Sequence, residues 1–94
     1  MIIVIVAAPI KLDYYRSKVH MGLIDQVVKF NKDQIETEHD KWLFIIPTRH
    51  WENKLRGVKI DRIYLCRNTV DYTEDVKIAI IPALSCGEKG VVIF

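Results

Sequence analysis

Four short runs of mainly apolar residues constrain the fold of this 94-residue chain more than any other feature. The first covers residues 2–7 and consists of isoleucine, valine and a final alanine, before Pro9 ends it; the others cover residues 42–46, 62–66 and 91–94. A strand with one face in water alternates polar and apolar residues, whereas a strand that is covered on both faces is apolar throughout. The runs therefore predict a parallel sheet between two layers of helices.

Segments with helical spacing separate these runs. Apolar residues recur every three to four positions over residues 13–30, a segment that begins with an aspartate able to cap a helix. Gly22 interrupts this pattern, so the alternatives are a kinked helix or two shorter helices. A second helix is predicted between Thr73 and Gly87, because two acidic residues follow Thr73, and Pro82 is expected to bend it. A short helical turn is expected at residues 51–55.

The predicted order of elements is β-α-β-(α)-β-α-β, and it uses almost the whole chain. Strands that alternate with helices indicate right-handed crossovers and a parallel sheet. We therefore expect a single α/β domain over residues 1–94, a small Rossmann-like three-layer structure with four parallel strands. The polar and acidic residues 31–41 are predicted to form a surface connection.

The composition restricts the class of protein. Half of the residues are hydrophobic and 28% are charged, which is typical of a packed globular domain. The longest apolar runs are far shorter than the roughly 18 residues that span a bilayer. The first run has no basic segment before it and no small-residue cleavage site after it. We therefore expect no membrane contact and a cytoplasmic location.

Residues that carry catalysis or metal binding do not occur at the spacings that these functions need. Cys66 and Cys86 form no C-x-x-C pair and are expected to be free buried thiols, and no histidine has metal-ligand spacing. Residues 8–13, where a phosphate-binding loop would lie, contain no glycine. We expect no enzyme activity, no cofactor and no metal. A weaker alternative is a small nucleotide-binding domain or enzyme that uses His50 and Asp13 at the carboxyl ends of the strands.

The net charge of +2 is unevenly distributed, because residues 49–62 contain five basic and two acidic residues. This segment combines guanidinium groups, an amide, an imidazole and an indole, which contact phosphates and stack on unpaired bases. It predicts a site for nucleic acid, preferably single-stranded, formed by Arg49, His50, Trp51, Lys54, Arg56, Lys59, Arg67 and Asn68. In the alternative interpretation, Trp51 and Leu55 hold a short helix on the core and the basic residues are simply solvated. An exposed Trp51 would favour the binding site.

Two motifs in the second half of the chain resemble a known family. Phe-Ile-Ile-Pro-Thr-Arg at residues 44–49 and Leu-Arg-Gly at residues 55–57 precede a strand, a helix and another strand. This order resembles the ASCE-type, RecA-like P-loop ATPase core of phage terminases and helicases, and the whole chain is similar in layout to short phage proteins. The resemblance implies a phage or viral protein in the host cytoplasm, with the four strands in the order 1-4-3-2. Cys66 and Arg67 replace the acidic residues that hold magnesium in that family, so ATP hydrolysis is not expected.

A 1-4-3-2 order would leave the first strand at an edge of the sheet. An uncharged, apolar edge strand tends to pair with another chain. We therefore expect a homodimer in which the first strand pairs with its copy through Ile2, Ile3, Val4, Ile5 and Val6. The alternative order 2-1-3-4 would place this strand inside the sheet.

Together, these features predict a small binding protein without catalytic activity that acts on nucleic acid or on nucleic-acid machinery. The alternative is an inhibitor or adaptor of a host protein, which would bind by surface complementarity at residues that the sequence does not identify. Binding that weakens steeply with salt would indicate nucleic acid, because the release of counterions favours such binding.

Overall fold

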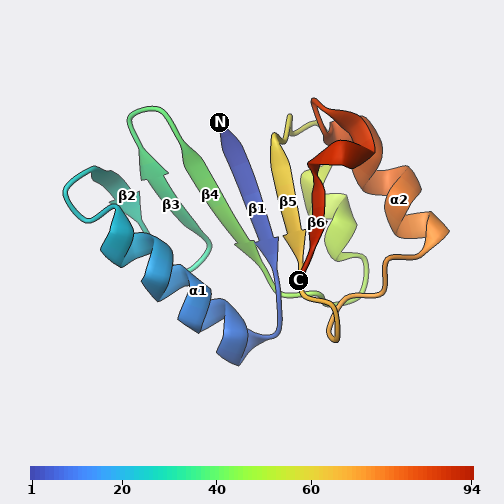
Figure 1. Ribbon diagram of the computed structural model, residues 1–94, viewed down its shortest axis with the longest axis horizontal. Helices are drawn as coiled ribbons and strands as arrows, with labels where there is room; N and C mark the ends of the chain where they lie inside the picture. Colours follow the sequence, from blue (N-terminus) through green and yellow to red (C-terminus); the bar gives the residue numbers. More distant parts are fainter.

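One sheet of six strands runs through the molecule (Figure 1). The computed structural model describes residues 1–94. The strands are Ile2–Val6 (β1), Val27–Phe30 (β2), Gln34–Thr37 (β3), Lys41–Ile45 (β4), Arg62–Leu65 (β5) and Val91–Ile93 (β6). They lie in the order β2-β3-β4-β1-β5-β6. Strands β1, β4, β5 and β6 are parallel, and β2 and β3 form an antiparallel hairpin beside β4.

Strand β1 lies inside the sheet. It pairs with β4 over Ile2–Val6 and with β5 over residues 3–6. The four parallel strands therefore follow the order 2-1-3-4, and the predicted order 1-4-3-2 is wrong. Both backbone edges of β1 are occupied, because a strand that is apolar on both faces is best buried at the centre of a sheet. The expected pairing of this strand with its copy is therefore also wrong for Ile2, Ile3, Val4, Ile5 and Val6.

Helices cover both faces of the sheet. Helix α1 (Pro9–Gly22) lies on one face, and the 3-10 helix η1 (Trp51–Leu55) and helix α2 (Glu74–Ile80) lie on the other (Figure 1). Alternate residues of β1 point to opposite faces, so Val4 packs under η1 and α2 while Ile5 packs under α1. The predicted α/β class is confirmed, with six strands instead of four. No helix is long and apolar enough to cross a membrane.

The segment between α1 and β4 differs most from its prediction. Residues 23–41 were expected to complete a long helix and then to form a surface connection, but α1 ends at Gly22 and the hairpin of β2 and β3 follows. Val27 and Phe30 are three residues apart, a spacing that fits a helix as well as a short strand with a bulge. The strand β2 contains such a bulge, so its residues do not alternate between apolar and polar. Without that alternation the sequence does not indicate a strand, and the helix prediction is wrong.

Local hydrogen bonds and one buried side chain hold the hairpin in place. The side-chain oxygen of Asn31 accepts hydrogen bonds from the backbone N–H groups of Asp33 and Gln34, at 2.9 and 3.0 Å. This arrangement closes the turn between β2 and β3. Ile35 of β3 is fully buried under α1, so the hairpin extends the core on this face.

The ends of the helices follow local capping rules. Helix α1 begins at Pro9, earlier than predicted, because proline has no N–H group to leave unpaired in the first turn. Thr73 caps α2 as predicted, and its hydroxyl oxygen accepts the backbone N–H three residues later at 3.3 Å. Pro82 does not bend a long helix. Instead, α2 ends and the 3-10 helices η2 (Ile81–Ala83) and η3 (Gly87–Gly90) follow separately.

Candidate nucleic-acid interface

The eight residues that were predicted to bind nucleic acid come from η1, from the segments on either side of it and from the loop after β5. Arg49 shares a small hollow at the carboxyl edge of the sheet with Asp71, whereas Lys54 lies beside Asp33 in a different hollow. The structure places Arg49 and His50 in the loop after β4, Trp51 and Lys54 in η1, Arg56 and Lys59 after η1, and Arg67 and Asn68 in the loop after β5. Acidic neighbours therefore accompany parts of the predicted basic segment and reduce its attraction for phosphates.

The side chain of Trp51 is buried. Its side chain is only 6% exposed and packs in the core under η1 and α2, together with Leu55, which is 1% exposed. These two residues therefore hold the short helix on the core, as the alternative interpretation expected, and the burial of the indole argues against a stacking role for Trp51. His50, just before η1, adopts a left-handed backbone conformation with φ of 60°, which turns the chain into the helix.

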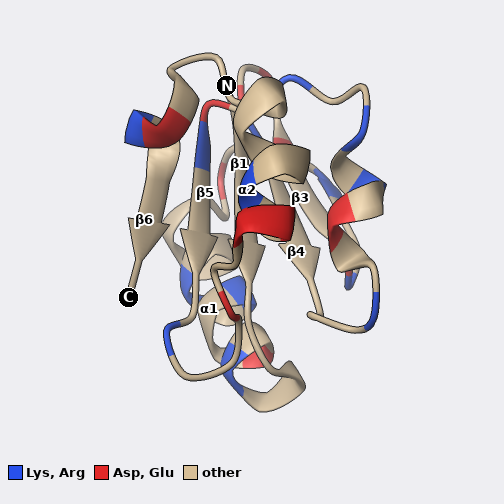
Figure 2. Ribbon diagram, turned by 90° about the vertical axis from the view of Figure 1, so that its right-hand side faces the viewer, with Lys and Arg blue, Asp and Glu red and all other residues tan.

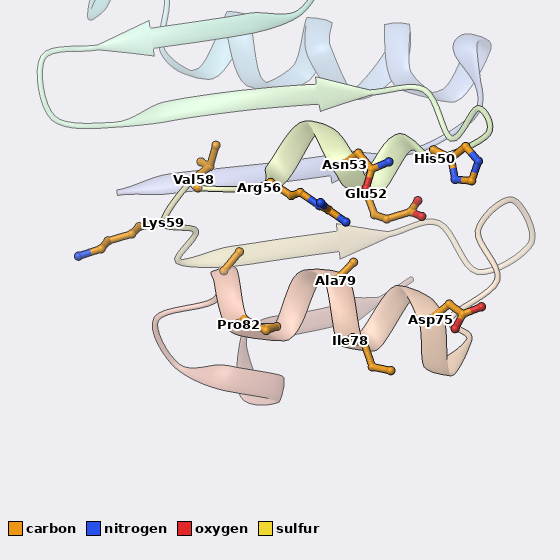
Figure 3. A pocket seen from close by; sticks show the side chains of 12 residues that line it. His50, Glu52, Asn53, Arg56, Val58, Lys59, Asp75, Ile78, Ala79 and Pro82 are labelled. Carbon is orange, nitrogen blue, oxygen red and sulfur yellow. The ribbon is translucent and has the colours of Figure 1, made fainter.

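A groove of about 870 Å³ lies between η1 and α2, next to the predicted basic segment (Figure 3). Its lining includes the basic residues Arg56 and Lys59 and the acidic residues Glu52 and Asp75. Figure 2 shows acidic and basic residues interspersed on this side of the molecule. The charges balance, so the groove does not attract a polyanion.

A different surface brings aromatic rings together on the α1 side of β5 and β6. The rings of Tyr15 and Phe94 lie 5.1 Å apart and nearly perpendicular, and those of Tyr64 and Phe94 lie 6.3 Å apart. Tyr14 continues the row, 5.4 Å from Tyr15. Such edge-to-face contacts between aromatic rings are favourable. We call Tyr14, Tyr15, Tyr64 and Phe94 the aromatic face.

The fold leaves the aromatic face accessible. Helix α1 lies over the β2–β3–β4 side of the sheet, and no helix covers β6 on this face (Figure 1). Tyr14 is 57% exposed and Phe94 is 37% exposed, while Tyr15 and Tyr64 are half-buried. Large aromatic side chains that remain this exposed mark interaction sites more often than isolated apolar residues do.

Four cations border the aromatic face, namely Lys11, Lys18, Arg62 and Arg67. The Lys18 ammonium lies 5.5 Å from the centre of the Tyr14 ring, and the backbone N–H of Arg67 donates to the Phe94 carbonyl at 2.6 Å. In β5, Ile63 points to the side of the sheet that η1 and α2 cover. Its neighbours Arg62 and Tyr64 therefore both point to the α1 side.

The four cations are free to bind a ligand. All are exposed, and none takes part in the three ion pairs of the structure. The side chain of Lys11 donates only to the Cys66 sulfur, at 3.7 Å. Two acidic residues nearby in the sequence have other partners, since Asp13 pairs with Arg16 and Asp61 accepts the backbone N–H of Ile2. No Asp or Glu side chain belongs to the aromatic face or its border.

Sequence reasoning identified only Arg67 of this surface. Tyr15 and Phe94 are far apart in the sequence, and only the fold brings the Tyr15 ring of α1 within 5.1 Å of the Phe94 ring, which follows β6. The available signal was the clustering of two lysines and two tyrosines within residues 11–18, on one side of a helix.

The titratable residues that the sequence singled out lie apart from one another. No group of three or more His, Cys, Asp or Glu side chains could hold a metal. Asp13 and His50 line different hollows. Cys66 is buried as expected, but Cys86 is exposed, so the expectation of two buried thiols is half wrong.

The only shifted pKa values belong to the outer side of α2. Burial raises the pKa of the Tyr72 phenol, and the neighbouring Glu88, which accepts its O–H at 3.4 Å, raises it further. The hydrogen bond and charge of Glu74 raise the pKa of Lys77. The Tyr72–Glu88 contact joins the segment before α2 to η3, and the Lys77–Glu74 ion pair lies within α2.

The fold and this surface define a small three-layer α/β domain with an aromatic, positively charged sheet face. Models of known protein families, curated proteins and solved structures were all compared with the chain, and none matches it significantly. The function must therefore be inferred from the surface itself.

Proposed function

We propose that this protein binds single-stranded nucleic acid on the aromatic face. The observation behind the proposal is a row of four partly exposed rings in edge-to-face contact, bordered by four cations without carboxylate partners. Aromatic rings stack on bases of any sequence, and Lys and Arg side chains bind the phosphates between them. This surface replaces the loop after β4 as the site.

The arrangement of the cations fits a strand that crosses the face. Helix α1 runs opposite to β1, so Lys11 lies with Arg67 near the carboxyl ends of the strands, whereas Lys18 and Arg62 lie near the amino ends. Phosphates can therefore be held at both ends while about two or three bases lie over the rings between them, as on other sheet surfaces that bind RNA.

Stacking on these rings requires bases that are not paired. In a duplex the ring faces of the bases are already covered by their neighbours, and only phosphates remain accessible. We therefore expect the protein to prefer a single strand over a duplex of the same length.

Substitution of Tyr14 tests the proposal. Tyr14 is 57% exposed and its loss leaves no cavity, so Tyr14→Ala should fold normally. If a base stacks on this ring, affinity for a fluorescent decathymidylate should fall by about 5- to 150-fold, from the roughly 1–3 kcal/mol of one stacked base. Fluorescence anisotropy measures both affinities.

A matched control variant uses an exposed apolar residue on the opposite face. Ile78→Ala, at a position that is 71% exposed on α2, should bind the decathymidylate as tightly as the unchanged protein. The proposal fails if Tyr14→Ala binds as tightly as Ile78→Ala, or if a duplex of equal length binds better than the single strand.

A further inference from the structure

The groove between η1 and α2 is lined by both apolar and charged side chains. One wall comes from η1 and the residues after it, and the other from the outer surface of α2 (Figure 3). Ile78, Ala79 and Pro82 line the α2 wall, and Ile78 is 71% exposed although it is a large apolar residue. An isoleucine this exposed at the rim of a hollow can bury apolar surface when a partner occupies the groove.

The charges in this groove are separated along its length. Lys59 lies toward one end and Asp75 toward the other, and between them Arg56 lies on the Lys59 side and Glu52 on the Asp75 side (Figure 3). None of these four side chains forms an ion pair or a side-chain hydrogen bond within the protein. Each end therefore offers unpaired charge of one sign to a ligand.

We propose that this groove binds a short extended segment of a partner protein, with acidic residues at one end, apolar residues in the middle and basic residues at the other. A nucleic acid would be repelled by Glu52 and Asp75, whereas a segment with both signs of charge matches both ends. The segment from Asp75 in α2 to Pro82 in η2 is about 10 Å long. An extended peptide spans this length with roughly three or four residues. The apolar middle of the segment would cover Ile78.

Three synthetic peptides test this inference. The first has two glutamates, two leucines and two lysines in that order, and the other two have the same leucines between four glutamates or between four lysines. The peptides are added to ¹⁵N-labelled protein and the backbone amide signals are recorded by NMR. We expect the first peptide alone to shift the signals of Glu52, Arg56, Asp75 and Ile78.

A double variant with unchanged net charge tests whether the charges at the two ends bind the peptide. Arg56→Gln combined with Asp75→Asn removes one charge from each end, and exposed ion pairs of ordinary strength predict that the first peptide binds about threefold to thirtyfold more weakly. Ile78→Ala should weaken the same peptide by roughly tenfold through lost burial.

Several outcomes would overturn the inference. Two of them are equal shifts from all three peptides and shifts that lie outside the groove. A third is no shift up to about 2 mM peptide, because the affinity would then be too weak for a useful interaction. The last is a shift of the groove signals with decathymidylate instead of the peptide. The aromatic face is on the other side of the sheet, so its variants leave this result unchanged and the two proposals can fail independently.

Discussion

Neutralising two arginines beside the aromatic face should halve the salt dependence of nucleic-acid binding. Arg62 and Arg67 are exposed and form no ion pair, so Arg62→Gln with Arg67→Gln should change the free energy of unfolding by less than about 0.5 kcal/mol each. If all four bordering cations contact phosphates, the logarithm of the binding constant falls with the logarithm of salt concentration at a slope of about −2.8, and at about −1.4 in the variant. Between about 50 and 200 mM salt, affinity then falls roughly 50-fold in the unchanged protein and roughly sevenfold in the variant.

A second double variant separates local contacts from total charge. Arg49→Gln with Arg56→Gln lowers the net charge from +2 to zero, as the first variant does, but these residues lie in the loop after β4 and in the groove. Anisotropy titrations of the fluorescent decathymidylate at four salt concentrations give the slopes. We expect the second variant to keep the slope of about −2.8. Equal slopes for the two variants, or a smaller slope for the second, would refute the assignment of phosphate contacts to the aromatic face.

The remaining predictions concern the core and the thiols. Trp51→Ala should lower the free energy of unfolding by about 3–5 kcal/mol, because the indole is 6% exposed and its removal leaves a cavity; urea denaturation followed by circular dichroism measures the change, and a loss below about 1 kcal/mol would contradict the buried position. Thr73→Ala should cost about 1 kcal/mol through the lost cap of α2, measured in the same way, with Thr69→Ala as an exposed control that should cost less. Cys86 should react with Ellman's reagent in the folded protein and Cys66 only after unfolding, so a single fast phase for both thiols would show that the carboxyl end of β5 is open.

The four parallel strands could be predicted because each is a run of apolar residues without alternation. Residues 2–7 and 42–46 show this most clearly, and both correspond to strands at the centre of the sheet. Their order could not be predicted, since the apolar character of β1 fits an unprotected edge as well as a central position. The hydrogen bonds that settle the order join residues about 40 and 60 positions apart in the sequence.

The hairpin was not predicted because the pattern of apolar and polar residues in β2 and β3 is too short to indicate strands. Gln34–Thr37 alternates over only four residues, in a segment rich in charge, and the burial of Ile35 is visible only once α1 is placed above it. The aromatic face was not predicted, for a related reason. Trp51 was selected because it is a large aromatic residue in a basic segment, but its side chain is buried in the core. Phe94, which was not selected, remains partly exposed.

One measurement tests the proposed binding surface most directly. Decathymidylate is added to ¹⁵N-labelled protein at low salt, and the changes in backbone amide signals are mapped on the structure. We expect the largest changes at the aromatic face and its border, at Lys11, Tyr14, Tyr15, Arg62, Tyr64, Arg67 and Phe94. Changes confined to residues 49–59, or no change at all, would contradict the proposal that the aromatic face binds single-stranded nucleic acid.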